Sequence, residues 1–270
     1  MALKDITIGQ YFPGHSFVHR MDPRMKMIVT FVFVIMLFCI SHPAGLLVGA
    51  LFLVVAYGVS GIPYKMILKS LKPVVPIILF TGILNIFFIQ GDPLFHFWFI
   101  TVYKQGVSTA LFMAARIILL IAGTSLLTYT SSPISLTDAI EQLFGPLKKL
   151  HFPVHELAMM MTIALRFIPT LIEETDKIMN AQKARGADME SGGLVQRAKS
   201  LIPILIPLFV SAFRRADELA LAMECRCYRG GEGRTRMRQL KYTYRDAAAL
   251  GVMAICFVGV FLLNRLPPLF

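Results

Sequence analysis

Residues 107–129, VSTALFMAARIILLIAGTSLLTY, form an almost unbroken apolar run in which Arg116 is the one charged residue. A straight helix needs about 20 apolar residues to cross the hydrocarbon core of a bilayer, so this stretch predicts a membrane span. A charge inside a span costs at least about 2.5–3.5 kcal/mol on insertion scales. We therefore expect the Arg116 side chain to face the protein interior or to snorkel, and a structural and a functional role are both open.

Four further apolar runs predict four more spans. The chain is 56% hydrophobic and contains 21 Phe among 270 residues, an apolar share above that of ordinary soluble domains. The first two runs are short and are separated by the turn SHPAG at residues 41–45, so flanking residues or a thinned bilayer must help them cross. The predicted spans cover about residues 27–40, 46–60, 73–89, 107–129 and 247–263.

The basic residues are distributed unevenly around these spans. Residues 1–26 carry four Lys or Arg, the 61–72 loop carries three, and residues 131–245 carry seventeen. The loops of the opposite side carry only Lys104 and, near the C-terminus, Arg265. Lys and Arg concentrate on the cytosolic side of membrane proteins. We therefore expect a multi-pass protein of the cell membrane, with the N-terminus and residues 131–245 in the cytosol and the C-terminus outside.

The net charge of +11 is explained first by this topology. Attraction to anionic membrane lipid adds to it, and no nucleic-acid partner is expected. The glycine-rich stretches lack the Lys-Ser/Thr pair of a phosphate-binding loop, and no Ser/His/Asp set stands out, so the chain is predicted to be non-catalytic. His151 and His155 lack further ligands, and Cys225 and Cys227 lack a second pair. We therefore predict no metal site and no cofactor.

The long basic segment of residues 131–245 reads as mostly helical, with Pro and Gly residues at its breaks. One helix runs from about residue 133 to 150 and is interrupted or ended near Gly145–Pro146. A second ends at Arg185 before the helix-stopping Gly186, and a third runs to Cys225. Apolar residues recur at spacings of three and four along the second helix, which predicts a strongly apolar face. Such a helix is expected to lie at the membrane interface or to pack against the bundle and its partners.

The second and third of these helices end in similar sequences. Residues 176–186 read DKIMNAQKARG, and residues 217–227, forty-one positions later, read DELALAMECRC. At this offset Arg185 matches Arg226. Two similar helices that each end in an arginine predict a pair of docking elements. The alternative is two solvated helices whose basic last turns simply suit the helix dipole.

Five stretches together give the chain a specific resemblance. They are HRMDPRMKM at 19–27, LKPVVPIILFTGILNIF at 71–87, TSSPISLTDAIEQLFGPLKKLHFPVHELAMMMTIALRFIPTLIEE at 130–174, KARGAD at 183–188 and AMECRCYRGG at 222–231. With them, nearly the whole chain resembles the transmembrane T component of energy-coupling factor (ECF) transporters, the EcfT/CbiQ family. The resemblance implies an all-α membrane protein with about five transmembrane helices and long cytosolic coupling helices. The regions would be 1–130 with four spans, 131–245 with the coupling helices, and 246–270 with the last span.

The resemblance also implies the binding residues. In that family an Ala-Arg-Gly-type signature ends each of two coupling helices, and its arginine binds a groove on one ATPase subunit. The first signature is intact here as Ala184, Arg185 and Gly186, whereas the second reads Cys225, Arg226 and Cys227. Both cysteines are small, so close approach of Arg226 is expected to be preserved. Because position 227 is Cys, we expect a backbone conformation there that does not require Gly.

The implied partners are two ATPase subunits and a small membrane-embedded substrate-binding S component, with which the chain would drive uptake of a vitamin or a metal ion. We expect the S component to contact the third span and the apolar faces of the cytosolic helices. The same residues could instead only stabilise the chain's own bundle. The expected contacts are Pro73, Pro76, Asn85, Met159, Met160 and Met161.

Two other classes of function remain for comparison. A stand-alone permease would carry solute through its own helix bundle, but the spans contain almost no charge besides Arg116 and no inverted repeat. A membrane-bound enzyme would need a catalytic constellation, which the sequence does not present.

Overall fold

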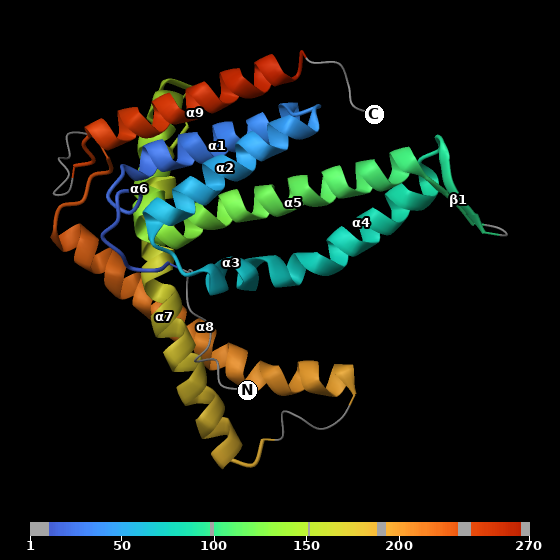
Figure 1. Cartoon of the computed structure of the whole chain (residues 1–270). Helices are drawn as coiled ribbons and strands as arrows, with labels where there is room; N and C mark the ends of the chain where they lie inside the picture. The colour runs from blue at the N-terminus through green and yellow to red at the C-terminus, as the bar shows by residue number, and fades with distance from the viewer. Residues whose placement is uncertain (1–10, 98–99, 151, 188–192, 232–238, 266–270) are drawn as a thin grey trace. The chain divides into compact units, whose positions relative to one another are not determined.

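The computed structural model describes residues 11–97, 100–150, 152–187, 193–231 and 239–265 (Figure 1). The helices are α1 (Pro23–Cys39), α2 (Pro43–Ser60), α3 (Tyr64–Leu71), α4 (Val75–Phe88), α5 (Lys104–Thr130), α6 (Pro133–Leu143), α7 (Val154–Ala184), α8 (Leu194–Cys225) and α9 (Tyr244–Leu263). Two short 3-10 helices, η2 (Lys72–Val74) and η3 (Gly145–Leu150), follow α3 and α6. The expectation of an all-α membrane protein is confirmed.

One small element of a different kind was not predicted. Strands β1 (Pro93–Phe97) and β2 (Ile100–Tyr103) pair in antiparallel between α4 and α5. The end of α4 and the start of α5 lie side by side at this hairpin. Gly106 near the start of α5 lies against the backbone of Asn85 and Ile86 near the end of α4. The hairpin therefore connects two long antiparallel helices at one end of the bundle (Figure 1).

Five described helices are long and apolar enough to cross a membrane. This number agrees with the prediction, but one of the five helices differs from the predicted set. The five helices are Pro43–Ser60, Tyr64–Phe88 (α3, η2 and α4 as one helix), Lys104–Thr130, Val154–Ala184 and Tyr244–Leu263. The predicted first span, α1, has 17 residues and is not among them, whereas α7 is. α7 is the least apolar of the five, because its apolar residues follow one face rather than its whole circumference.

The chain divides into two compact units. The bundle unit consists of residues 9–139 with 239–270, and the crossed-helix unit centres on residues 140–238. Helices α1, α2, α5 and α9 pack against one another in the bundle unit, and α3 and α4 pack on α5. Helices α7 and α8 pack against each other in the crossed-helix unit. The three-region division at residues 130 and 245 stays a prediction.

Helix α1 supplies the centre of the bundle core. Phe33, Met36 and Leu37 are fully buried, and the Phe33 ring lies so close to Gly123 of α5 that a Cβ atom there would come within 2.5 Å of it. Tyr57 of α2 donates its hydroxyl to the carbonyl of Ala122 at 2.7 Å. Close helix approach at a small residue is typical of membrane bundles, where van der Waals packing rather than the hydrophobic effect joins the helices.

Arg116 has a structural role in this bundle. Its guanidinium donates through Nη2 to the carbonyl of Ile40, which caps the end of α1, and it lies 4.7 Å from the centroid of the Phe112 ring. Asn264, the C-cap of α9, donates to the carbonyl of Cys39 at 2.6 Å and accepts from the backbone N–H of Ser41 at 3.1 Å. These side chains satisfy backbone groups that the end of α1 leaves unpaired. The side chain of Arg116 faces the protein interior, as expected.

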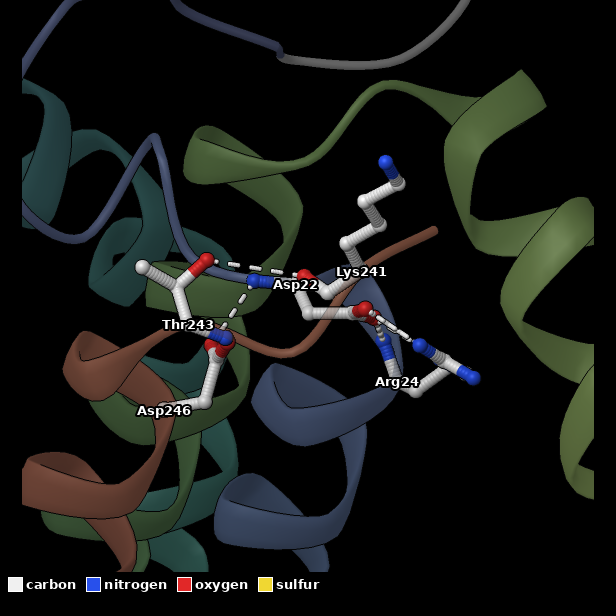
Figure 2. Close-up of polar contacts among 5 residues, drawn as sticks. All are labelled: Asp22, Arg24, Lys241, Thr243 and Asp246. Carbon is white, nitrogen blue, oxygen red and sulfur yellow. Dashed lines mark hydrogen bonds and ion pairs between the residues drawn. The ribbon is translucent and has the colours of Figure 1, made fainter. Parts of the chain in front are cut away.

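The first residues of α1 and α9 are joined by a buried carboxylate (Figure 2). Asp246 accepts from the backbone N–H of Thr243 at 2.7 Å, completing a capping box on α9, and from the backbone N–H of Asp22 at 2.9 Å. Asp22 in turn caps α1 and binds the Arg24 guanidinium, with 2.7 Å between its Oδ2 and Nη2. One carboxylate thus satisfies the N–H of Thr243 beside it and the N–H of Asp22, which is 224 residues away from Asp246 in the sequence.

Candidate functional site

The two candidate docking helices, α7 and α8, run in opposite directions where they meet. Glu174 of α7 binds Arg215 of α8 at 2.7 Å and accepts from the Ser211 hydroxyl at 2.6 Å. Further along α7, Gln182 donates to the carbonyl of Pro203 at 3.4 Å. Residue numbers therefore rise along α7 while they fall along α8. Figure 1 shows the two helices crossing.

Helix α7 ends at the predicted arginine. Arg185 is its C-cap, and Gly186 follows in the left-handed conformation with φ of +85°. The N–H of Gly186 donates to the carbonyl of Lys183 at 3.0 Å, and the N–H of Ala187 donates to the carbonyl of Gln182 at 3.0 Å. This pair of bonds defines a Schellman motif, in which Gly is the usual left-handed residue. The predicted helix stop at Gly186 is confirmed.

Helix α8 ends in the same way, forty-one residues later. Arg226 is its C-cap; the N–H of Cys227 donates to the carbonyl of Glu224 at 2.8 Å, and the N–H of Tyr228 donates to that of Met223 at 3.0 Å. Each of these bonds corresponds to one at the end of α7. The weak sequence repeat therefore reflects a repeat of backbone structure.

Cys227 adopts a left-handed conformation, which Gly favours but does not alone adopt. Its φ is +54°, and it is the one residue other than Gly with a positive φ in the part of the chain that the structure describes. The Schellman bonds require the left-handed region at this position whatever the residue, so Cys adopts a conformation that is typical of Gly. For an L-residue other than Gly, this conformation costs roughly 1–2 kcal/mol. The second signature keeps the geometry of the first at the expense of local strain.

Both arginine side chains are available for a partner. Arg185 and Arg226 are exposed, as are Ala184, Cys225 and Cys227 beside them. Neither guanidinium makes an ion pair or a side-chain hydrogen bond with any residue that the structure describes. An arginine fixed at a helix end offers five N–H donors in a planar fork that suits carboxylates and carbonyls. The arrangement can dock a helix end into an acidic or carbonyl-lined groove.

The two arginines lie at equal distances from the ion pair between α7 and α8. Arg185 is eleven residues beyond Glu174, and Arg226 is eleven residues beyond Arg215. At about 1.5 Å per residue, each arginine lies roughly 16 Å along its helix from this ion pair. Because the helices run in opposite directions, their arginine ends point away from each other. The crossed-helix unit therefore presents two separate arginine-tipped helix ends, with an ion pair between the helices midway along the path that joins them.

The other named residues are exposed or half-buried in the two units. Pro73 lies in η2 and Pro76 in the first turn of α4, and both are exposed. The 3-10 segment interrupts the helix at this pair, where proline has no N–H to donate. Asn85 is half-buried, and its side chain donates to the carbonyl of Thr81 in its own helix at 2.9 Å. On α7, Met160 and Met161 are exposed and Met159 is half-buried.

Sequence reasoning named no residue of α8 as a contact of the S component, although α8 carries a long exposed apolar face. The spacing of three and four residues was the signal that could have identified it. Six large apolar side chains at this spacing are exposed: Ile202, Leu205, Ile206, Phe209, Val210 and Phe213.

No group of three or more His, Cys, Asp or Glu residues that could hold a metal ion occurs among the described residues. His151 lies outside the described residues, and His155 contacts Glu141 at 2.9 Å. The arginine-tipped helix ends therefore remain the candidate site.

Comparison with known proteins places the chain in a class. A family profile described as cobalt transport protein matches residues 14–237. The chain is 55% identical over 262 residues to the energy-coupling factor transporter transmembrane protein EcfT of Ruminiclostridium cellulolyticum, covering 97% of this chain and 98% of that protein. It is 54% identical over 266 residues to EcfT of Clostridium kluyveri (98% of each chain) and 47% identical over 263 residues to EcfT of Bacillus subtilis (97% and 99%). These matches and the helical bundle define a multi-pass membrane transport protein.

Within that class, the chain belongs to the EcfT family, the transmembrane T components of energy-coupling factor transporters. The predicted resemblance is confirmed. Membership of a transporter complex and a multi-pass membrane location follow from it, together with the five apolar helices.

The strain at Cys227 makes a testable prediction about the end of α8. Cys227→Gly removes the cost of the left-handed conformation and is expected to stabilise the last turn by about 1 kcal/mol, whereas Cys227→Val should destabilise it by a similar amount. Hydrogen exchange of the amides around residues 223–228 measures this directly. Cys225→Ala, two residues earlier at the last position of α8, serves as the control and should change exchange little. Faster exchange in Cys227→Gly than in the parent protein would contradict the prediction.

Proposed function

We propose that this chain is the energy-coupling subunit of an ECF-type importer and that it joins two cytosolic ATPase subunits to a substrate-binding S component. The observation that carries the proposal is the identical Schellman geometry at the ends of α7 and α8, with an exposed arginine as the C-cap in each. In this proposal Arg185 binds one ATPase subunit and Arg226 the other. Ala184, Gly186, Cys225 and Cys227 allow the close approach.

The chemistry of arginine supports such docking. A guanidinium can pair bidentately with a carboxylate and also bond carbonyl oxygens, and it is more weakly hydrated than an ammonium group. The helix C-terminus adds exposed carbonyl groups beside it, which a partner's N–H donors can satisfy. The left-handed residue that follows turns the chain away, so the arginine forms the tip of the helix.

The crossed helices supply a way to transmit motion. When ATP binding draws the two ATPase subunits together, both arginine ends would be pulled toward each other. The bonds of Glu174 to Arg215 and Ser211 hold α7 and α8 together at their crossing, so a displacement of either end moves the pair. A two-state change of this kind is a domain motion driven by the nucleotide. The chain contributes rigidity and attachment points, and the ATPase subunits contribute the chemistry.

The apolar surfaces of the two units suit an S component. The helix Tyr64–Phe88 has no buried residue in the described structure, and its exposed residues include Phe80 and Phe87. On the crossed-helix unit, the α8 face and Met160–Met161 are exposed. Adaptable methionine-rich packing tolerates a partner that detaches and is replaced. The transported vitamin or metal ion would then be selected by the S component.

Site-directed crosslinking tests the S-component contacts. Photoreactive residues at Pro76, Met160 and Phe209 are expected to crosslink to the S component in the assembled complex, because these side chains are exposed and otherwise have no apolar cover. Position 35 of α1, where Ile35 is also exposed, provides a control on another helix of the bundle. Crosslinks confined to the chain itself, in complexes that contain the S component, would refute these contacts.

The orientation proposed from the basic residues places the N-terminus and residues 131–245 in the cytosol and the C-terminus outside. In a variant that retains only Cys227 of the native cysteines, an impermeant thiol reagent is expected to leave intact cells unlabelled, although Cys227 is exposed. Leu269→Cys in a cysteine-free background should label from outside, because five spans separate the two ends. Labelling of Cys227 in intact cells, with lysed cells as the positive control, would refute the orientation.

The alternative function is a permease that carries solute through its own bundle. Purification of the chain from its host in mild detergent separates the two. Co-elution of two ATPase subunits and a small membrane protein, with no solute flux by the chain alone in vesicles, is the result expected for a coupling subunit. Flux by the purified chain alone would establish the permease.

A further inference from the structure

The bundle unit contains a lateral groove that the proposed coupling function does not use. Its volume is about 420 Å³, and it lies between α2 and α9 with α1 and α5 as its floor. Val55 and Val59 of α2 and Val252 of α9 line it and are also exposed, so the groove opens sideways between these two helices. α2 and α9 are both long and apolar enough to cross a membrane, so in a bilayer that both helices span the opening would face the lipid.

The interior of the groove calls for an apolar occupant. Its lining is almost entirely aliphatic and aromatic. The one charged residue in the lining is Lys26, and backbone carbonyl groups of the protein bind its ammonium group. The Lys26 Nζ donates to the carbonyl of Thr130 at 2.8 Å and to that of His19 at 3.2 Å. A helix with its side chains is about 10–12 Å across, so a partner helix would cover a groove of this size without filling it. A hydrocarbon chain can enter.

A cation lies at one end of the groove. The Arg245 guanidinium is 5.9 Å from the centroid of the Phe17 ring, which lines the groove, and its Nε donates to the Tyr244 hydroxyl at 3.3 Å. Arg245 forms no ion pair with any described residue. It also lies in the first turn of α9, where the helix dipole disfavours a cation and favours an anion. An anionic group at this position would offset both effects.

We propose that this groove binds one phospholipid, with an acyl chain between α2 and α9 and the phosphate against Arg245. The lining residues of α9, from Ala248 to Cys256, extend about 12 Å along the helix, which suits a straight stretch of acyl chain. Arg245 precedes them by less than one helical turn. A phosphate bound to Arg245 would therefore lie directly next to an acyl chain in the groove. Arg245 is a cation without a described carboxylate partner, so an anionic phospholipid is preferred over a zwitterionic one.

The experiment compares lipid retention by the full chain and its variants. Each protein is stripped of lipid in detergent, supplied with equal amounts of phosphatidylglycerol and phosphatidylcholine, and examined by native mass spectrometry. The parent chain should retain one phosphatidylglycerol. Arg245→Gln should weaken this retention about fivefold, the effect of one interfacial charge, whereas Arg245→Lys should largely keep it. Val252→Trp should prevent retention by filling the groove.

Two matched variants provide the controls. Arg265 lies over the Phe261 ring at 5.6 Å near the other end of α9, so Arg265→Gln removes a similar arginine outside the groove and should leave retention unchanged. Ile255 is 73% exposed on α9 and does not line the groove, so Ile255→Trp adds the same bulk elsewhere. Equal effects of Arg245→Gln and Arg265→Gln, or of Val252→Trp and Ile255→Trp, would show non-specific lipid and overturn the proposal. Retention that survives Val252→Trp in the folded protein would overturn it too.

Discussion

The double variant Arg185→Ala with Arg226→Ala is expected to abolish coupled substrate uptake while the chain still inserts into the membrane. Both side chains are exposed and contribute no described ion pair or side-chain hydrogen bond to the fold, so their loss should not unfold it. Truncating one charged group of a buried, hydrogen-bonded interfacial pair typically costs about 2–5 kcal/mol. Losing two such groups removes both attachments of the crossed-helix unit. Uptake of labelled substrate by cells, normalised to the amount of chain in the membrane, measures the effect.

The single and conservative variants sharpen this prediction. Each single Arg→Ala change should lower uptake strongly, and Arg→Lys should restore only part of it, because an ammonium group cannot reproduce the bidentate geometry. Arg214, an exposed arginine in the middle of α8, provides the control, and Arg214→Ala should leave uptake nearly unchanged. Full uptake by the double variant at normal expression would refute the proposed docking role of Arg185 and Arg226.

Asp246→Ala is expected to cause the second large effect, which concerns stability. The change removes the capping box of α9 and leaves the buried N–H of Asp22 without its acceptor. Loss of a cap costs about 0.5–2 kcal/mol and a buried unsatisfied donor about 1–3 kcal/mol, so the sum is about 1.5–5 kcal/mol. The thermal midpoint of the purified chain in detergent should fall by several degrees.

A comparison with another acidic residue tests whether the junction in Figure 2 is the cause. Asp217 is exposed on α8 and accepts no described hydrogen bond, so Asp217→Ala should leave the midpoint nearly unchanged. Asp246→Asn should be intermediate, because its amide keeps one acceptor oxygen and places an NH₂ group against the second N–H donor. Equal midpoints for Asp246→Ala and Asp217→Ala would refute the role of the junction.

The elements with a local signal were predicted well. The helix ends at Arg185 and Arg226 follow from apolar periodicity and from the residues at the stops, and both lie where the sequence placed them. The membership of α1 and α7 among the span candidates was less predictable. Helix α1 is apolar but short, whereas α7 is long but apolar on only one face. A prediction based on apolar runs therefore includes α1 and omits α7.

The features that were missed depend on contacts or conformations without a local signal. The sequence Thr243-x-x-Asp246 is typical of a capping box, but nothing near it indicates that Asp22, 224 residues away, shares the same carboxylate. The left-handed conformation of Cys227 was not predicted, because the residue itself gives no signal for it and the hydrogen bonds of the motif determine φ. The role of Arg116 likewise required the end of α1 to be in place.

Direct capture of the ATPase subunits tests the central claim most closely. The chain is purified in mild detergent from cells that also produce the two ATPase subunits, and the amount of each subunit retained per chain is measured. The account predicts that the parent chain retains both subunits, that each single arginine variant retains them less firmly in rising salt, and that the double variant retains neither. Equal retention by the parent chain and the double variant would contradict it.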